Sequence, residues 1–88
     1  MSEQDTLFEF PCEFAIKAMG LATPEFDALV VEIVRRHAPD LGEGAVATRP
    51  SKNGKFLSVT VTINATSKEQ LDAIYQALTD HELVLMSL

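Results

Sequence analysis

Residues 51–64 read SKNGKFLSVTVTIN, and this stretch decides the fold. After its first residues, apolar and hydroxyl-bearing side chains alternate strictly, which is the period of a β-strand with one buried and one wet side. The preceding Asn53-Gly54 pair is the strongest short signal for a hairpin and predicts a type I′ turn, in which both residues have positive φ. We therefore predict a strand over residues 56–64 that pairs antiparallel with a short strand over residues 45–50, which Pro50 limits to a sheet edge.

The segment before the hairpin predicts a strand followed by a helix. Residues 12–19 alternate with a period of two, and Gly20 is expected to end this strand. Thr23 is expected to accept hydrogen bonds from free backbone N–H groups at the start of a helix. Apolar residues then recur at helical spacing over residues 26–37, and Pro39 prevents the helix from continuing.

The segment after the hairpin predicts a second helix and a last strand. Residues 66–70 can form a capping box in either of two registers, and the helix that follows is expected to end near Asp80-His81. Residues 82–88 are then expected to form a strand with apolar side chains on both faces. Alternation places three of these side chains on one face: Val84, Met86 and Leu88.

Two strand–helix–strand units joined by a hairpin predict an α+β domain, a ferredoxin-like βαββαβ sandwich. Its four-stranded antiparallel sheet is expected to have the order 4-1-3-2, with two helices on one face. Because a chain of 88 residues has room for one core, residues 1–88 are predicted to form a single domain, with residues 1–10 as a partly flexible N-terminal arm. One apolar face of the last strand then needs a cover, either this arm or another polypeptide.

The charge balance excludes several classes of partner. Seven basic and thirteen acidic residues give a net charge of −6, which repels phosphate backbones and anionic membrane surfaces. The outward positions of the two central strands also carry no aromatic residue on which bases could stack. The acidic N-terminus and the absence of a long apolar run predict a cytoplasmic protein, and its single cysteine, Cys12, cannot form an internal disulfide. Nucleic acid and membrane are therefore not expected as partners.

Five separated segments carry a family resemblance: FPC at 10–12, KAMG at 17–20, RHAP at 36–39, PSKNGK at 50–55 and SVTVTINA at 58–65. In order and spacing they resemble the YbeD-like domain-of-unknown-function family of bacteria. The resemblance implies a ferredoxin-like fold similar to the ACT-type regulatory domains of amino-acid metabolism. It also implies a gene often found near those for lipoate attachment and synthesis, but it supplies no catalytic residue.

Catalysis is not expected from the residues themselves. One cysteine and two histidines, with no metal-ligand or nucleophile spacing, predict no catalytic site, no metal and no cofactor. His37 ends the first predicted helix and His81 follows the second. At both positions a positively charged side chain would interact favourably with the helix dipole. Cys12 is interpreted as a packing residue.

The candidate contact residues come from the outward positions of the central strands, the loop after the first strand and the last strand, and the sequence leaves open whether the outward face of the sheet is functional. Candidate ligand- or partner-binding residues are Lys17, Gly20, Ser58, Thr60, Thr62, Val84 and Met86. Gly20 belongs to this set because the corresponding loop of ACT-type domains helps to bind a small effector. We favour a regulatory or adaptor domain that binds a cytoplasmic protein, with a homodimer also open. An ACT-like small-molecule sensor is the alternative, and an enzyme is a distant third.

Overall fold

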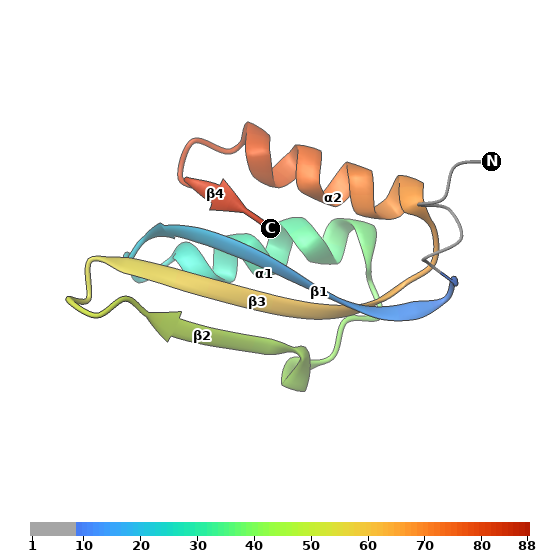
Figure 1. Ribbon diagram of the computed structural model, residues 1–88, viewed down its shortest axis with the longest axis horizontal. Helices are drawn as coiled ribbons and strands as arrows, with labels where there is room; N and C mark the ends of the chain where they lie inside the picture. Colours follow the sequence, from blue (N-terminus) through green and yellow to red (C-terminus); the bar gives the residue numbers. More distant parts are fainter. Residues whose placement is uncertain (1–8) are drawn as a thin grey trace.

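The computed structural model describes residues 9–88 and contains four strands and two long helices (Figure 1). In chain order the elements are β1 (Cys12–Leu21), α1 (Phe26–His37), the 3₁₀ turn η2 (Glu43–Ala45), β2 (Val46–Pro50), β3 (Phe56–Ala65), α2 (Lys68–Asp80) and β4 (Met86–Ser87). Neither helix is long and apolar enough to cross a membrane.

The sheet has the predicted topology. Its strands lie in the order β2-β3-β1-β4, and every neighbouring pair is antiparallel. Figure 1 shows β2 and β4 at the two edges, with α2 on the β4 side. The ferredoxin-like α+β sandwich is therefore confirmed.

The core lies between one face of the sheet and the two helices. The register pairs Ile16 with Val61 and Ala18 with Val59, so buried side chains of the two central strands stand side by side. The helices contribute the other half of the core: Phe26, Val30, Ile33, Val34, Leu71, Ile74 and Leu78. The alternation read in β3 is confirmed, because Val59 and Val61 are fully buried while Ser58 and Thr60 are not.

The start of α1 differs from the prediction in two respects. β1 continues through Gly20 to Leu21, because both residues still pair with β3, at Leu57 and Phe56. Gly20 is needed for packing instead, since a Cβ there would collide with the Leu83 carbonyl oxygen and the Phe26 ring. Thr23 does not cap the helix with its side chain. A turn at residues 24–25 separates Thr23 from the helix, so Glu25 occupies the cap position and makes no side-chain cap hydrogen bond.

The start of α2 uses one of the two predicted registers. Ser67 Oγ accepts a hydrogen bond from the Gln70 N–H at 3.0 Å, and Gln70 Oε1 accepts one from the Thr66 N–H at 2.8 Å. Gln70 Nε2 also donates to the His37 carbonyl oxygen at 2.7 Å. The capping residues of α2 thus also hold the C-terminal end of α1.

The hairpin is present, but its turn is not type I′. Gly54 has φ of 75°, whereas Asn53 does not have a positive φ. The Gly54 N–H donates to the Ser51 carbonyl oxygen at 2.9 Å, and Asn53 Oδ1 accepts from the Lys55 N–H at 3.1 Å. The asparagine side chain therefore acts as the acceptor within the loop, so only the glycine needs the left-handed conformation.

The last strand is much shorter than predicted. A turn occupies its first part, where the Val84 N–H donates to the His81 carbonyl oxygen at 3.1 Å. The Leu85 N–H donates to the Met19 carbonyl oxygen at 2.8 Å, while Met86 is the residue paired with Met19. Two residues thus lie opposite one, as in a β-bulge, and the bulge changes the alternation of side chains. Val84 consequently packs against the core, whereas Met86 is exposed, so they do not share a face as predicted.

Candidate functional site

No other described segment covers the face of the sheet opposite the helices. The side chains on this face form rows across the strands. The register aligns Arg49 of β2, Ser58 of β3 and Met19 of β1 in one row, which Met86 of β4 completes. The next row contains Ala47, Thr60, Lys17 and Leu88. We call this surface the open face.

Most of the predicted contact residues meet on the open face. Residues of this group are Lys17, Ser58, Thr60, Thr62 and Met86. Gly20 and Val84 lie elsewhere: Gly20 is buried against Phe26, and Val84 packs against the core. Gly20 therefore has a packing role that accounts for its presence.

Arg49 and Met19 were missed by the sequence prediction, although one signal for Arg49 was available. Counting outward from Asn53-Gly54 pairs Arg49 with Ser58, and the structure has this pair. The pairing does not depend on the type of turn, so the hairpin alone could have placed Arg49 beside the predicted contact residues.

Charge is divided unequally between the two sides of the molecule. Of the seven Lys and Arg residues, Lys17 and Arg49 lie on the open face, and Lys52 and Lys55 lie in the adjacent hairpin loop. Within residues 9–88, none of these four makes an ion pair, whereas the helices hold the pairs Arg36–Glu32 at 2.8 Å and Lys68–Asp72 at 3.7 Å. Arg35 on α1 is also outside these pairs, so four of the five Lys and Arg residues without an ion pair in residues 9–88 lie on the open face or in its hairpin loop.

A shallow hollow of about 480 Å³ lies where the open face meets the hairpin. Its lining consists of Met19, Arg49, Pro50, Ser51, Lys52, Phe56 and Ser58. Ser51 Oγ is already used, because it accepts a hydrogen bond from the Phe56 N–H at 2.9 Å. The Lys55 ammonium lies 5.5 Å from the centre of the Phe56 ring, so this lining residue of the hollow also contacts a cation. An apolar floor with positive groups at its rim suits a ligand that is apolar and negatively charged.

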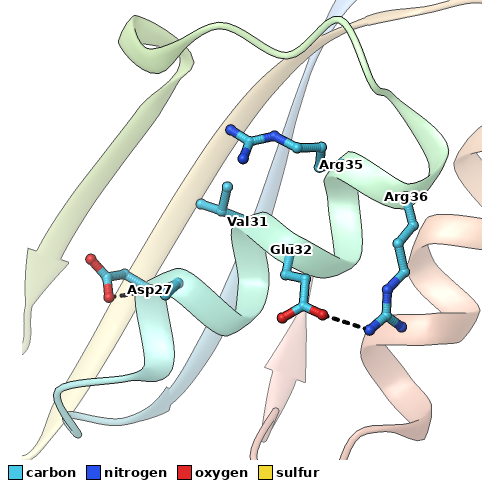
Figure 2. Close-up of a pocket in the computed structure, with 6 residues that line it drawn as sticks. Asp27, Val31, Glu32, Arg35 and Arg36 are labelled. Carbon is cyan, nitrogen blue, oxygen red and sulfur yellow. Dashed lines mark hydrogen bonds and ion pairs between the residues drawn. The ribbon is translucent and has the colours of Figure 1, made fainter.

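A second hollow, of about 500 Å³, lies along the outer side of α1 (Figure 2). Its charged groups are largely satisfied locally: Asp27 Oδ1 accepts from the Ala28 N–H at 2.8 Å, and Glu32 binds Arg36. Figure 2 shows that the labelled residues all come from this one helix, with half-buried Val31 between them. This hollow is an ordinary solvated helix surface.

The described residues offer little chemistry for catalysis. In residues 9–88, no group of three or more His, Cys, Asp or Glu lies close enough together to hold a metal ion. Cys12 is half-buried against the core, and His81 Nδ1 accepts from the Leu83 N–H at 3.1 Å. Burial raises the pKa of Tyr75, which packs edge-on against Phe14 with ring centres 6.5 Å apart. These groups are separate, and none points with another into either hollow.

The family follows from a comparison with known proteins. Residues 5–88 match the model of a protein family of unknown function, DUF493. The chain belongs to this family. The resemblance read from the five sequence segments is thus confirmed, and the DUF493 description assigns no activity.

Relatives of this DUF493 chain are bacterial proteins of nearly the same length. The UPF0250 protein of Chromobacterium violaceum is 51% identical over 86 residues, which cover 98% of this chain and 97% of that protein. The UPF0250 protein NE1487 of Nitrosomonas europaea is 47% identical over 85 residues, covering 97% and 98%. The solution structure of protein HP0495 from H. pylori has a TM-score of 0.69, an identity of 18%, and coverage of 92% of this chain and 85% of that one. At this identity the HP0495 structure supports the fold alone.

Proposed function

We propose that this chain is a non-enzymatic adaptor or regulatory domain that binds another cytoplasmic protein through the open face. The observation that carries the proposal is the pair Lys17 and Arg49, which make no ion pair within residues 9–88 although the chain has a net charge of −6. They adjoin exposed apolar side chains of the same rows, Met19 and Met86. Exposed apolar patches mark contact sites, and arginine and methionine are enriched at protein interfaces relative to the rest of the surface.

The partner segment should be acidic and should carry at least one large apolar side chain. An exposed ion pair contributes only about 0–1 kcal/mol, so the cations alone would not hold a partner. Burying ~200 Å² of apolar surface in the hollow would contribute ~5 kcal/mol before the entropic cost of association is subtracted. The apolar anchor therefore supplies most of the affinity, while Lys17 and Arg49 supply orientation and a faster approach of an acidic partner.

The family resemblance suggests where to search for the partner. Because it implies a gene near those for lipoate attachment and synthesis, the enzymes of lipoate metabolism are the first proteins to test. Their acidic surface segments would be the expected contact.

The experiment compares two charge reversals of equal size. Arg49→Glu alters the open face, and Lys68→Glu alters an exposed cation at the start of α2. Each immobilised variant is used to capture proteins from the lysate of the native host, and captured proteins are identified by mass spectrometry. We expect a protein that the unmodified chain and Lys68→Glu retain and that Arg49→Glu loses. Equal capture by all three chains would contradict the open face as the contact site.

A small-molecule sensor is the second candidate, and the hollow beside Arg49 and Lys52 is the observation that favours it. Its apolar floor and two cations suit a small apolar carboxylate. A ligand at 100 times its Kd would stabilise the domain by about 2.7 kcal/mol. A sensor should therefore show a clear rise in Tm with lipoate, octanoate or an apolar amino acid, and an adaptor should show none.

A further inference from the structure

Exposed apolar side chains are concentrated at one edge of the sheet. Among residues 9–88, the exposed large hydrophobic residues all lie in residues 19–21 and 83–88. They are Met19, Leu21, Leu83, Leu85, Met86 and Leu88, with exposed fractions between 36% and 69%. Such a concentration is unusual for a surface that meets only water.

These side chains lie on both sides of β4. Met19 and Met86 are a cross-strand pair on the open face, and Leu88 lies on the same face because it pairs with Lys17. Leu21, Leu83 and Leu85 surround a small recess of about 60 Å³, whose lining also includes Thr23, Phe26 and the charged residue Glu82. Leu21 follows the same alternation along β1 as Lys17 and Met19, so the apolar surface continues from the open face to this recess.

The backbone of β4 also has hydrogen-bonding groups that point away from β1. Lys17 and Leu88 exchange both of their backbone hydrogen bonds, at 2.9 Å and 2.8 Å. In an antiparallel ladder the neighbouring residue, Ser87, must then direct its N–H and carbonyl away from β1. Ser87 forms no backbone hydrogen bond within residues 9–88 on that side. One donor and one acceptor are therefore available to an added strand.

We infer that a second copy of this chain occupies this edge, with the two β4 strands paired antiparallel about Ser87. This register is self-complementary: Ser87 meets Ser87 of the second copy, and Met86 lies opposite Leu88 of the second copy, twice. The two-fold axis is perpendicular to the sheet, so the two sheets become continuous and both open faces lie on the same side.

Charge and area both favour a second copy as the occupant. Residues 83–88 carry no charged side chain, and Glu82 is the one charged residue that lines the recess beside them, whereas the chain as a whole has a net charge of −6, which repels an identical chain at most other contacts. Six side chains that are about half exposed leave on the order of 500 Å² of apolar surface, the upper range for the largest patch of a monomer. Complete cover of this patch on both copies would bury about 1,000 Å² in total, which reaches the lower limit of a specific interface. Met19 and Met86 belong to both surfaces, but the inference rests on the β4 backbone and the proposed function on the open-face cations, so either can fail without the other.

The test uses Ser87→Pro with Ser87→Ala as its matched control. Proline removes the outward N–H, which the single chain does not use, and proline is accepted at a sheet edge. Alanine keeps this donor. Sedimentation velocity from ~10 µM to ~1 mM should show the unmodified chain and Ser87→Ala moving from the mass of one chain to that of two. Ser87→Pro should stay at the mass of one chain while its circular dichroism remains unchanged.

A second variant keeps the inference falsifiable if Ser87→Pro fails to fold. Met86→Lys places like charges at the centre of the proposed contact, and Met86 is 52% exposed, so the single chain should tolerate the change. It should also remain at the mass of one chain. An unmodified chain that stays single at ~1 mM would overturn the inference, and so would folded Ser87→Pro or Met86→Lys variants that still associate as the unmodified chain does.

Discussion

The two edges of the sheet are built differently, and the difference separates an edge that repels other chains from one that accepts them. β2 ends in Arg49 and Pro50 and leads into a hairpin with two lysines. Proline and charge are the usual protection of an edge strand. β4 has neither, and its neighbours along the chain are exposed leucines. The unprotected edge is therefore where we place contact with a second copy, while Arg49 at the protected edge belongs to the open face.

The largest expected effect tests whether the central strands, rather than the β4 edge, hold the fold together. Ile16 is fully buried on β1 and paired with Val61. Ile16→Ala should lower the free energy of unfolding by about 2–5 kcal/mol, because it removes buried methyl groups and leaves a cavity. Met86→Ala, made at the exposed edge, should change it by less than ~0.5 kcal/mol. Urea melts of both variants at low micromolar protein concentration would measure these changes. Similar losses of stability in the two variants would contradict the comparison between the central strands and the β4 edge.

A smaller loss of stability is expected from a substitution at Gly20, where β1 meets the segment that leads into β4. Gly20→Ala places a methyl group against the Leu83 carbonyl oxygen and the Phe26 ring, so the backbone must shift. The expected loss is about 1–3 kcal/mol, the range for overpacking. Gly44→Ala is the matched control, since nothing lies within 4 Å of a Cβ at that position. Equal stability of the two variants in urea melts would show that this close approach is not needed.

At the β2 edge, the hairpin should be sensitive at one residue. Gly54 has φ of 75°, and an alanine in this left-handed conformation costs about 1–2 kcal/mol. Lys52→Ala, in the same loop but without positive φ, should leave stability nearly unchanged. Thermal unfolding of both variants would measure the difference. If Gly54→Ala were as stable as Lys52→Ala, the turn would have another conformation.

The smallest expected effect is a change in the pH dependence of stability caused by Tyr75, which lies in α2 and not at either edge of the sheet. Burial raises the pKa of Tyr75 above its ordinary value of 10.0. The folded state therefore keeps the phenol proton at a pH where the unfolded chain has lost it. Stability should be unaffected below pH 10 and should fall slightly as the pH rises through this value. Tyr75→Phe should remove this decline, and stability measurements from pH 8 to 11 that show the same slope for both chains would contradict it.

The sequence predicted the central part of the fold because the signals there are local. The alternation in β3 and the Asn53-Gly54 pair are properties of neighbouring residues, and they determine one buried face and one pairing register. The turn type was wrong because the Asn53 side chain accepts the Lys55 N–H, which removes the need for positive φ at Asn53. Local alternatives of this kind have similar energies, so a residue pair alone does not decide between them.

The C-terminal segment was predicted less well because its conformation depends on distant contacts. The bulge opposite Met19 and the close approach of Leu83 to Gly20 join residues more than sixty positions apart along the chain. No periodicity in residues 82–88 contains that information, and the predicted face of Val84 was wrong for this reason. On the open face, Lys17, Ser58 and Thr60 could be placed from strand alternation alone. The unequal charge became visible only when Arg49 was placed beside them.

The most direct test of the account is a nuclear magnetic resonance spectrum of the isotope-labelled chain in unlabelled lysate of the native host. Backbone amide signals are compared with those in buffer at the same low concentration, where self-association is negligible. We predict that signals of Lys17, Met19, Arg49, Ser58 and Thr60 broaden selectively, while those of Glu32 and Arg36 on the outer side of α1 do not. Broadening centred on α1 instead, or an unchanged open face, would contradict the claim that this face binds another protein.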